Sequence, residues 1–396
     1  MMRKCPLCSD NHAEVVCNQR YCLEETSLLP PETAVVACSG CGFVFARSDK
    51  TASDYSGYYS EQTKYESTVN ASGSGEYELD KKRITDLVYT LTEGQATDMS
   101  VLDIGAAKGG VLVEFQRKGY KELFGVDASE ACVKSMHSYG IEACIGSLED
   151  DGWAVDPRQF DLIILSHVLE HVFDVVAGLA SARRRLTPGG TIYVEVPDAS
   201  RYTVEGFPPY YFFDPEHINH FDLDSLRLMA AHEGLVLSKW QAKELDVGAA
   251  SSYPAIAVWL VAQTDADKPE PEINSAEAIQ HYVEASAATL MALPNMALLQ
   301  DLVKKDAPIV IWGAGSHAKR LLANGPLVSA NLVAIIDSDT SKHGKLLRGV
   351  EICSAQRGLQ RAQDNNATIV VAIAVNADEV LTELHSAVDN LSIISV

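Results

Sequence analysis

The chain has 396 residues, of which 47% are hydrophobic and 22% are charged. This composition is typical of a globular protein with a sizeable core, and the length predicts two or three domains of roughly 100–200 residues each. The formal net charge of −22 argues against a general nucleic-acid-binding protein, because binding to phosphates requires clustered Lys and Arg side chains. We therefore expect a small-molecule substrate and no nucleic-acid partner.

The N-terminus lacks the apolar core of a signal peptide, and no stretch approaches the roughly 18–20 apolar residues of a membrane span. We therefore expect a cytoplasmic protein with no membrane partner. Six of the nine cysteines lie within the first 41 residues. In a reducing compartment, such a local cluster favours a metal site over disulfide bonds.

The first 75 residues predict a small zinc-binding module followed by an aromatic linker or lid. Cys5 and Cys8 form one Cys-x-x-Cys pair, Cys38 and Cys41 form a second, and four thiolates at this spacing suit a tetrahedral, structural Zn²⁺ ion. The alternatives are a redox-active pair or four unrelated buried cysteines. Residues 51–75 are rich in Tyr, Ser and Gly, and they include Tyr59.

Residues 76–265 predict a parallel, doubly wound sheet, because strand and helix patterns alternate along them. A helix is expected over 76–92, and a hairpin-like turn over 186–190. The expected strands are 100–104, 123–127, 160–166 and 191–196, followed by an antiparallel pair over 235–242 and 255–262. The acidic, Pro-containing residues 265–272 mark a boundary.

A glycine turn follows the first of these strands. Gly105 permits close approach of the backbone to a ligand, and Gly109 exposes backbone N–H groups. Asp127 ends the next strand, where a carboxylate can accept hydrogen bonds from both ribose hydroxyls. The strand over 160–166 then opens into a polar segment at Ser166 and His167. These features predict a nucleotide-type cofactor.

In this order and spacing, the motifs resemble those of the class I S-adenosylmethionine-dependent methyltransferases over about residues 80–262. The resemblance implies S-adenosylmethionine as the cofactor. It places Asp103 and Gly105 beside the methionine part, in a turn that also contains Ala107 and Gly109; Asp127 at the ribose; Ser147 and Leu148 at the adenine; and Ser166 and His167 under the sulfonium. Ala107 departs from the glycine more common in that family, which predicts a tighter turn.

Residues 207–222 predict a loop at the C-terminal edge of the sheet, where ligands bind in open α/β folds. Their density of prolines, histidines and carboxylates does not suit a core strand. His217 follows Glu216, and a histidine beside a carboxylate can act as a general base near neutral pH. His220 has two open interpretations: a base, or a residue packed beneath a helix that Asp222 caps. His171 is interpreted as structural.

Residues 266–396 predict one or two helices and then a second Rossmann-like domain. A strand over 308–312 runs into Gly313-x-Gly315-x-x-Ala318, and Asp337 follows, which is nominally a dinucleotide fingerprint. No second chemistry that requires NAD is evident, so we expect no redox cofactor here. The helix N-terminus after Gly315 is an anion site that suits a diphosphate.

The sequence thus predicts an α/β fold: a Rossmann-like, doubly wound methyltransferase sheet, a small N-terminal zinc module and a second, C-terminal Rossmann-like domain. This combination resembles the sugar C-methyltransferases that act on nucleotide-linked keto-deoxysugars. In that family a Tyr-Asp-Glu-His stretch supplies the base, and Glu216 and His217 match its last two residues. Pro215 intervenes and Phe213 stands where the tyrosine is expected. The hydroxyl would then come from Tyr210, Tyr211 or Tyr59.

The resemblance implies that a 4-keto group acidifies the neighbouring C3–H bond, that His217 removes this proton, and that the enolate attacks the methyl group of the cofactor. Glu216 would orient His217 or bind a sugar hydroxyl. One alternative is an O- or N-methyltransferase that acts on a sugar or natural-product intermediate with the same base. Another is a non-catalytic binding protein that keeps the cofactor fold as a scaffold.

Overall fold

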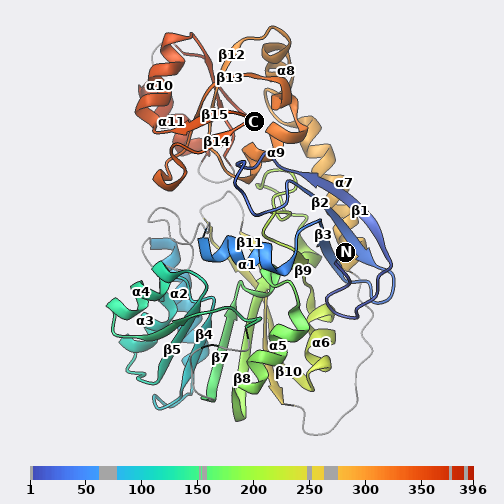
Figure 1. The fold of residues 1–396 in the computed structure, drawn as a ribbon, viewed down its shortest axis with the longest axis vertical. Helices are drawn as coiled ribbons and strands as arrows, with labels where there is room; N and C mark the ends of the chain where they lie inside the picture. The colour runs from blue at the N-terminus through green and yellow to red at the C-terminus, as the bar shows by residue number, and fades with distance from the viewer. Residues whose placement is uncertain are drawn as a thin grey trace.

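The computed structural model describes residues 3–61, 78–150, 153, 158–247, 252–262, 275–373, 377–387 and 391–396. Three β-sheets organise this part of the chain. A seven-stranded sheet and a six-stranded sheet lie at opposite ends of the molecule, and the N-terminal ribbon lies between them (Figure 1). The expected domain boundaries near residues 75 and 265 lie outside the described residues and stay predictions.

The seven-stranded sheet has the order β10-β11-β8-β7-β4-β5-β6. Its first five strands in chain order are parallel, whereas β11 runs antiparallel to both of its neighbours. The strands are β4 (Val101–Ile104), β5 (Leu123–Asp127), β6 (Glu142–Ile145), β7 (Phe160–Ser166), β8 (Leu186–Pro197), β10 (Leu235–Leu245) and β11 (Tyr253–Ala262). The antiparallel pair expected at the end of the sheet is confirmed.

Helices cover both faces of this sheet, because apolar side chains on each face need burial. On one face α2 (Glu78–Thr92), α3 (Gly110–Arg117) and α4 (Glu130–Ser138) enclose a buried apolar cluster. On the other face α5 (Val175–Arg184) and α6 (Leu223–His232) do the same. Two short 3₁₀ helices, η2 (Leu169–His171) and η3 (Ala199–Arg201), follow β7 and β8. The predicted doubly wound fold is confirmed.

Two local predictions about this sheet need correction. Residues 186–190 do not form a separate turn, because β8 already pairs at Leu186, opposite Phe160, and pairing with β7 resumes at Thr191 after a register shift. A bulge of this kind accommodates the Pro-Gly-Gly residues. Strand β6 was not predicted, since it is a four-residue edge strand with partly exposed residues at every position.

The N-terminal sheet has the order β1-β2-β3-β9, with β1 (Ala13–Arg20), β2 (Glu32–Cys38), β3 (Val44–Arg47) and β9 (Asn219–His220). Strand β9 belongs to the loop 207–222, and it pairs with β3 through Val44 opposite His220 and Phe45 opposite Asn219. The sheet therefore joins the N-terminal module directly to that loop. Residues 52–61 form helix α1 (Ala52–Glu61) rather than the expected linker; residues 62–75 lie outside the described residues.

The six-stranded sheet has the order β14-β15-β13-β12-β16-β17, parallel except for β14. This confirms a second Rossmann-like sheet. Its strands are β12 (Pro308–Trp312), β13 (Asn331–Ile336), β14 (Leu346–Leu347), β15 (Val350–Cys353), β16 (Thr368–Val371) and β17 (Ile393–Ser395). Its helices are α8 (Met296–Lys304), α9 (Ser316–Asn324), α10 (Ala355–Asp364) and α11 (Ala377–Ala387), with η4 (Pro326–Ser329) and η5 (Thr340–Lys342).

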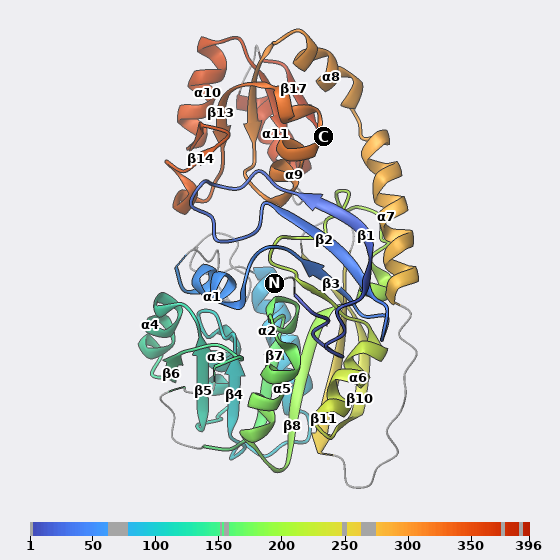
Figure 2. The same ribbon diagram turned by 45° about the vertical axis from the view of Figure 1, so that its right-hand side comes forward.

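Helix α7 (Ser275–Ala292) connects the two large sheets along one side of the molecule (Figure 2). The Tyr282 hydroxyl accepts a hydrogen bond from the Phe212 backbone N–H at 3.1 Å, and Ser286 Oγ accepts one from the Tyr210 N–H at 3.1 Å. Helix α7 therefore fixes the backbone of the loop 207–222 at Tyr210 and Phe212. Among the described helices, none is both long and apolar enough to cross a bilayer.

Arg3 ties the N-terminal module to two loops of the seven-stranded sheet. Its guanidinium donates hydrogen bonds to the carbonyl oxygens of Phe173 (2.6 Å) and Ile218 (2.9 Å) and to Asn219 Oδ1 (2.7 Å). Burial lowers the pKa of Arg3 to about 10, so the side chain remains charged at neutral pH. One loop follows β7 and the other precedes β9, and Arg3 holds the two together.

Replacing Arg3 with Met should lower the free energy of unfolding by about 3 kcal/mol or more, because buried carbonyl oxygens would lose their donors. Urea unfolding of the full chain measures this change. Arg20→Met is the control, since Arg20 pairs with Glu32 on the surface, with side chains 59% and 66% exposed, and such pairs contribute about 0–1 kcal/mol. Equal losses in the two variants would contradict a clamping role for Arg3.

Candidate functional site

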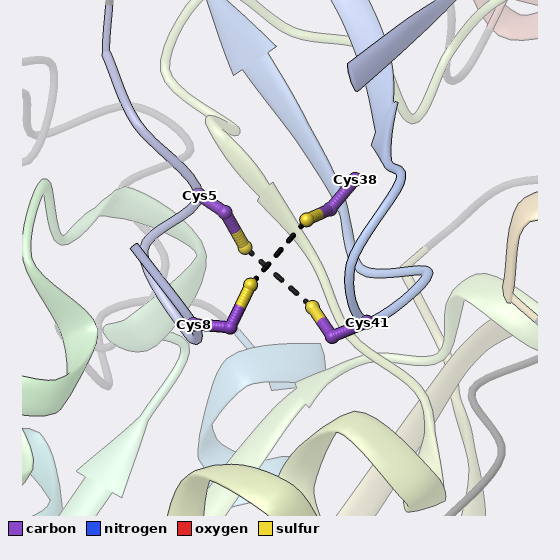
Figure 3. A group of neighbouring side chains, drawn as sticks. All are labelled: Cys5, Cys8, Cys38 and Cys41. Atoms are coloured by element: carbon purple, nitrogen blue, oxygen red, sulfur yellow. Dashed lines mark hydrogen bonds between the residues drawn. The ribbon is translucent and has the colours of Figure 1, made fainter. Parts of the chain in front are cut away.

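Four cysteine sulfurs of the N-terminal module point toward one another (Figure 3). The Sγ atoms of Cys5 and Cys41 lie 3.6 Å apart and those of Cys8 and Cys38 lie 3.4 Å apart. In a tetrahedral site with Zn–S bonds of about 2.3 Å, neighbouring sulfurs lie about 3.8 Å apart. The four predicted ligands are therefore assembled as a zinc ion would require.

The turn after β4 needs glycine for its backbone conformation and for space. Gly105 has a φ of +73° and Gly109 a φ of +85°, values that L side chains rarely adopt. A Cβ atom on Gly105 would lie 2.7 Å from Val168 Cγ2, and one on Gly109 would lie 2.5 Å from Met136 Cγ. Ala107 also has a positive φ, +46°, which is uncommon for a residue other than glycine; the tighter turn expected there stays a prediction.

Asp103 and Asp127 are the carboxylates beside this turn. Asp127 accepts hydrogen bonds from the backbone N–H groups of Ala107 (2.8 Å) and Ser129 (2.9 Å), which fix it at the end of β5, where nucleotide-binding sheets carry their ribose-binding acid. Burial, together with the charge of Asp127, raises the pKa of Asp103 to about 8. A cation bound beside Asp103 would favour its ionised form.

The other predicted cofactor residues differ in their surroundings. Ser147 donates from its N–H (2.8 Å) and its hydroxyl (3.0 Å) to Asp150 Oδ2 just after β6, and Ser166 ends β7. Leu148 is buried in the apolar core, where its side chain lies over Gly178. Ser147 and Ser166 thus lie at the C-terminal edge of the sheet, whereas Leu148 packs inward; their cofactor roles stay predictions.

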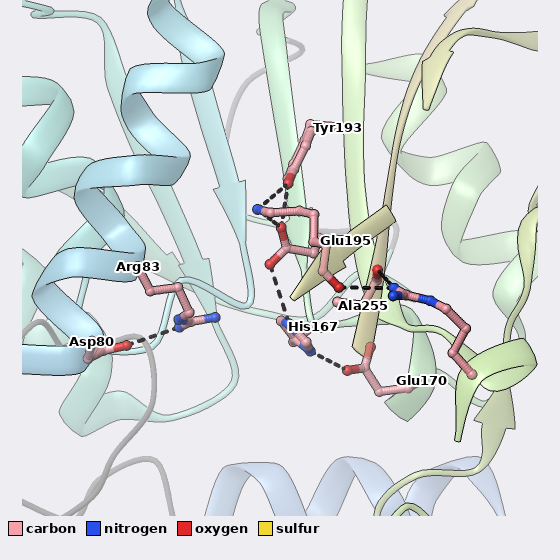
Figure 4. A network of polar contacts seen from close by, with 9 residues as sticks. Asp80, Arg83, His167, Glu170, Tyr193, Glu195 and Ala255 are labelled. Carbon is pink, nitrogen blue, oxygen red and sulfur yellow. Dashed lines mark hydrogen bonds and ion pairs between the residues drawn. The ribbon is translucent and has the colours of Figure 1, made fainter. Parts of the chain in front are cut away.

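His167 lies between two buried carboxylates (Figure 4). Its Nδ1 is 3.0 Å from Glu170 Oε1 and its Nε2 is 3.4 Å from Glu195 Oε1, while Lys243 and Tyr193 contact the other oxygen of Glu195. Burial favours the neutral ring, but the interactions with Glu170 and Glu195 outweigh it and raise the pKa of His167 to about 9. His167 is therefore a cation at neutral pH and a poor general base.

His171 and His217 face each other across the two loops that Arg3 holds together, with ring centroids 5.0 Å apart. His171 Nδ1 lies 2.9 Å from the backbone carbonyl oxygen of Glu216. The backbone N–H of His217 donates a hydrogen bond to the backbone carbonyl of Asp214 at 3.0 Å. The carboxylate of Glu170 lies close to both imidazole rings. The predicted base, His217, thus packs against His171, which the sequence analysis interpreted as a structural residue.

Tyr58 is a residue of this site that the sequence analysis missed. Its hydroxyl donates a hydrogen bond to Glu216 Oε1 at 3.0 Å. Tyr59, a predicted candidate, packs edge-on against His171 with ring centroids 5.6 Å apart. Tyr211, also predicted, packs against Phe207 at 4.7 Å. If the sequence analysis had predicted a helix over 52–61, the adjacent residues Tyr58 and Tyr59 would have been expected to point in different directions and to contact different residues of the site.

The surroundings of His220 favour its structural interpretation. The residue is 1% exposed, and its Nδ1 lies 3.3 Å from the Tyr202 hydroxyl. Burial lowers the pKa of His220 to about 3, which keeps the ring neutral. Asp222 caps α6 by accepting a hydrogen bond from the Ser225 N–H at 2.8 Å. His220 therefore lies in the packed strand before a capped helix, as one of its two interpretations expected.

A cavity of about 640 Å³ lies between the N-terminal module, the loop 207–222 and the C-terminal sheet. Pockets for small ligands fall within roughly 300–1,000 Å³. Tyr58 and Glu216 line one part of it, and Gly315 and Ser316 at the start of α9 line another. Its basic side chains are Lys319, Lys342 and Lys345. The cavity thus connects the predicted acceptor loop to the predicted anion site.

Asp337, the acidic residue of the C-terminal fingerprint, is held by donors from the protein itself. Its Oδ2 accepts hydrogen bonds from the Ala314 N–H (2.8 Å) and Lys342 Nζ (3.0 Å), and its Oδ1 accepts one from the Asp339 N–H (2.9 Å). In this arrangement the carboxylate fixes the glycine turn after β12 and places Lys342 at the cavity.

Comparison with known proteins agrees with the topology of the seven-stranded sheet. Residues 77–239 match the family model of a methyltransferase domain. Two relatives are ubiquinone biosynthesis O-methyltransferases: that of Thiobacillus denitrificans is 31% identical over 108 residues, or 26% of this chain and 46% of the relative, and that of Pseudomonas putida is 32% identical over 98 residues, or 24% and 42%. The chain thus spans less than half the length of these curated relatives.

Among solved structures, an S-adenosylmethionine-dependent methyltransferase from Clostridium acetobutylicum aligns with a TM-score of 0.38 and 13% identity, over 48% of this chain and 94% of that one. Neither sequence relative is named as a sugar C-methyltransferase, so the predicted subfamily is not confirmed. Residues 77–239 match a methyltransferase domain, which agrees with the class of enzyme predicted from the sequence.

Proposed function

We propose that this chain is an S-adenosylmethionine-dependent methyltransferase that methylates a carbon atom of a nucleotide-linked 4-keto-deoxysugar. The observation that carries the proposal is the single cavity shared by Glu216, the first turn of α9 and three lysines. A helix N-terminus and lysine ammonium groups suit a diphosphate, and the linked sugar would extend toward Glu216. The same cavity is also lined by the carboxylates of Glu24, Glu61, Asp214, Glu216 and Asp339, so the three lysines serve there as local phosphate partners and do not make the cavity positive overall.

The turn after β4 supports S-adenosylmethionine as the cofactor, which when bound supplies an electrophilic methyl group. Gly105 and Gly109 allow the backbone to approach a ligand closely. Asp127 would accept the ribose hydroxyls, and Asp103 would ionise beside the methionine ammonium group. The residues present therefore fit this cofactor.

Replacing Asp127 with Asn should weaken S-adenosylmethionine binding by about 10- to 100-fold, because hydrogen bonds to a charged group contribute about 1.5–3 kcal/mol. Isothermal titration calorimetry measures the affinity. Asp224→Asn is a matched control, since Asp224 pairs with Arg227 on the surface of α6 and should leave the affinity unchanged. No detectable binding by the unaltered chain would instead favour the non-catalytic scaffold.

His217 is the proposed base that removes the C3 proton of the keto sugar. Glu216, held by the Tyr58 hydroxyl at 3.0 Å, would bind a sugar hydroxyl beside it. His167 cannot take this role, because its carboxylate partners keep it protonated at neutral pH. The proton would pass from C3 to the His217 imidazole, and the resulting enolate would provide the nucleophilic carbon.

His217→Gln should reduce methyl transfer by about 10²–10⁴-fold, the usual contribution of a general base, with cofactor affinity unchanged. The assay uses methyl-labelled S-adenosylmethionine and a panel of nucleotide-linked 4-keto-6-deoxysugars in deuterated water. The unaltered enzyme should also exchange the C3 proton without cofactor, and the variant should not. Near-normal exchange in His217→Gln would remove His217 as the base.

O-methylation is the second candidate, and the names of the sequence relatives favour it. The same base would then take a proton from a hydroxyl group. Nuclear magnetic resonance of the labelled product separates the two reactions, since a methyl group on oxygen and one on carbon have different chemical shifts. A methyl group on oxygen would move the enzyme to this second class.

We also propose that Cys5, Cys8, Cys38 and Cys41 bind a structural Zn²⁺ ion, which their sulfur positions fit. All four ligands come from the protein, so the metal would stabilise the module and take no part in chemistry. The second cysteine pair lies at the connection between β2 and β3, and β3 pairs with β9. The ion would therefore also support the loop that carries His217.

Cys38→Ser should therefore lose one equivalent of zinc per chain, lower the thermal midpoint and reduce turnover at least tenfold, because site zinc contributes directly to folding. Native mass spectrometry counts the metal, and differential scanning fluorimetry gives the midpoint. Cys17→Ser is the control, since Cys17 is a partly buried residue of β1 outside the group of four sulfurs. Unchanged zinc content in Cys38→Ser would contradict the assignment.

A further inference from the structure

Glu170, His171 and His217 bring three potential metal-ligand atoms together outside the cysteine cluster. Each contributes one atom, and the three atoms lie within 4.8 Å of one another. Glu170 and His171 are in η2, directly after β7, and His217 comes from the loop before β9. The site therefore spans the two loops that Arg3 holds together.

In two members of this trio, Glu170 and His171, neighbouring groups already hold the side-chain atom that would not bind a metal. Glu170 Oε1 lies 3.0 Å from His167 Nδ1. His171 Nδ1 lies 2.9 Å from the carbonyl oxygen of Glu216; a carbonyl only accepts hydrogen bonds, so Nδ1 carries the proton and Nε2 keeps its lone pair. This outer arrangement, a histidine that donates to a carbonyl and an oriented carboxylate, is typical of metal sites.

The second oxygen of Glu170 provides an independent indication. Glu170 is 1% exposed, and its Oε2 has no hydrogen-bond partner among the described residues. A buried carboxylate oxygen without a donor is costly, and a cation at the centre of the trio would supply the missing partner. Burial opposes ionisation of Glu170, but the hydrogen bond from His167 favours the ionised form, and the pKa of Glu170 stays below its usual value.

The charges around the trio permit a cation. One positive group beside the trio is His167, and both Glu170 and Glu195 contact it. Another is Arg3, whose guanidinium donates hydrogen bonds to the backbone carbonyl groups of Val172 and Ile218. The buried acids therefore offset the charge of His167, and Lys243 contacts Glu195 rather than the trio. Tyr59, whose ring packs edge-on against His171, and Glu216, which precedes His217 in the chain, also lie beside the trio.

We propose that Glu170, His171 and His217 form a second metal site, which binds a divalent transition-metal ion such as Zn²⁺ or Co²⁺. Two histidines and one carboxylate with an open fourth position are a ligand set that such ions favour. Ligand atoms in a tetrahedral site with bonds of about 2.0–2.1 Å lie about 3.3 Å apart, so binding would bring the three ligand atoms closer by rotation of their side chains.

This site would place metal binding and proton transfer in competition. The consequence rests on the proposed function, in which the His217 lone pair takes the C3 proton, because a lone pair bound to a metal cannot also accept a proton. Divalent transition metals should therefore inhibit the enzyme reversibly. Metal binding should weaken as the pH falls, since protons compete for both histidines.

The test is a Co²⁺ titration of the full chain with zinc already bound at the four cysteines. Visible absorption should report one further equivalent, with d–d bands of nitrogen and oxygen ligands and without thiolate charge-transfer bands. His171→Gln and Glu170→Gln should each weaken this second binding by at least tenfold. His232→Gln, an exposed histidine at the end of α6, should leave it unchanged, and circular dichroism should confirm that each variant is folded.

The absence of a second equivalent, or an unchanged affinity in both His171→Gln and Glu170→Gln, would overturn the site. This result is separate from the fate of the proposed function. If Co²⁺ binds as expected but His217→Gln still exchanges the C3 proton, the metal site stands and the base assignment fails. If exchange depends on His217 but no second equivalent binds, the function stands and the metal site fails.

Discussion

The position of the acceptor loop depends on one buried guanidinium. Arg3 contacts carbonyl groups of the segment after β7 and of the segment before β9, and these segments carry His171 and His217. A buried arginine is stable only when its donors are paired, so the two segments cannot separate without leaving a charge unpaired in the core. Arg3 precedes Cys5 by two residues, which couples the proposed zinc site to the same contacts.

A second constraint is the alternation of charge across the open edge of the sheet. Lys243, Glu195, His167 and Glu170 alternate in sign from β10 to η2, so the buried network carries little net charge. The methyl donor of the proposed reaction is a cation. A site with unbalanced histidine and lysine charges would repel it, whereas paired charges and the nearby Asp103 do not. The network thereby fixes these side chains at the sheet without repelling the positively charged methyl donor of the proposed reaction.

The sequence predicted features that depend on local patterns. The strands β4, β5, β7 and β8, the glycine turn and the four cysteines each follow from spacing within a short segment. Tyr58 and Arg3 were missed because their roles depend on contacts with residues more than 150 positions away, and no local pattern reports such contacts. The helix over 52–61 was missed for a related reason: its Tyr- and Ser-rich sequence has low helix propensity, and burial of Tyr55 and Tyr58 stabilises it.

The proposed anion site lies in a strongly acidic protein. At an ionic strength of 0.15 M, solvent-exposed charges more than about 8 Å apart are largely screened, so the exposed acidic side chains that give the net charge of −22 act only weakly at long range. Lys319 pairs with Glu24 and Lys342 with Asp337, so neither acts as an isolated positive charge. In the proposed site, backbone N–H groups at the start of α9 would then carry much of the attraction for a phosphate. Their fixed direction selects an anion by geometry, which suits recognition of one diphosphate better than general attraction of negative ligands.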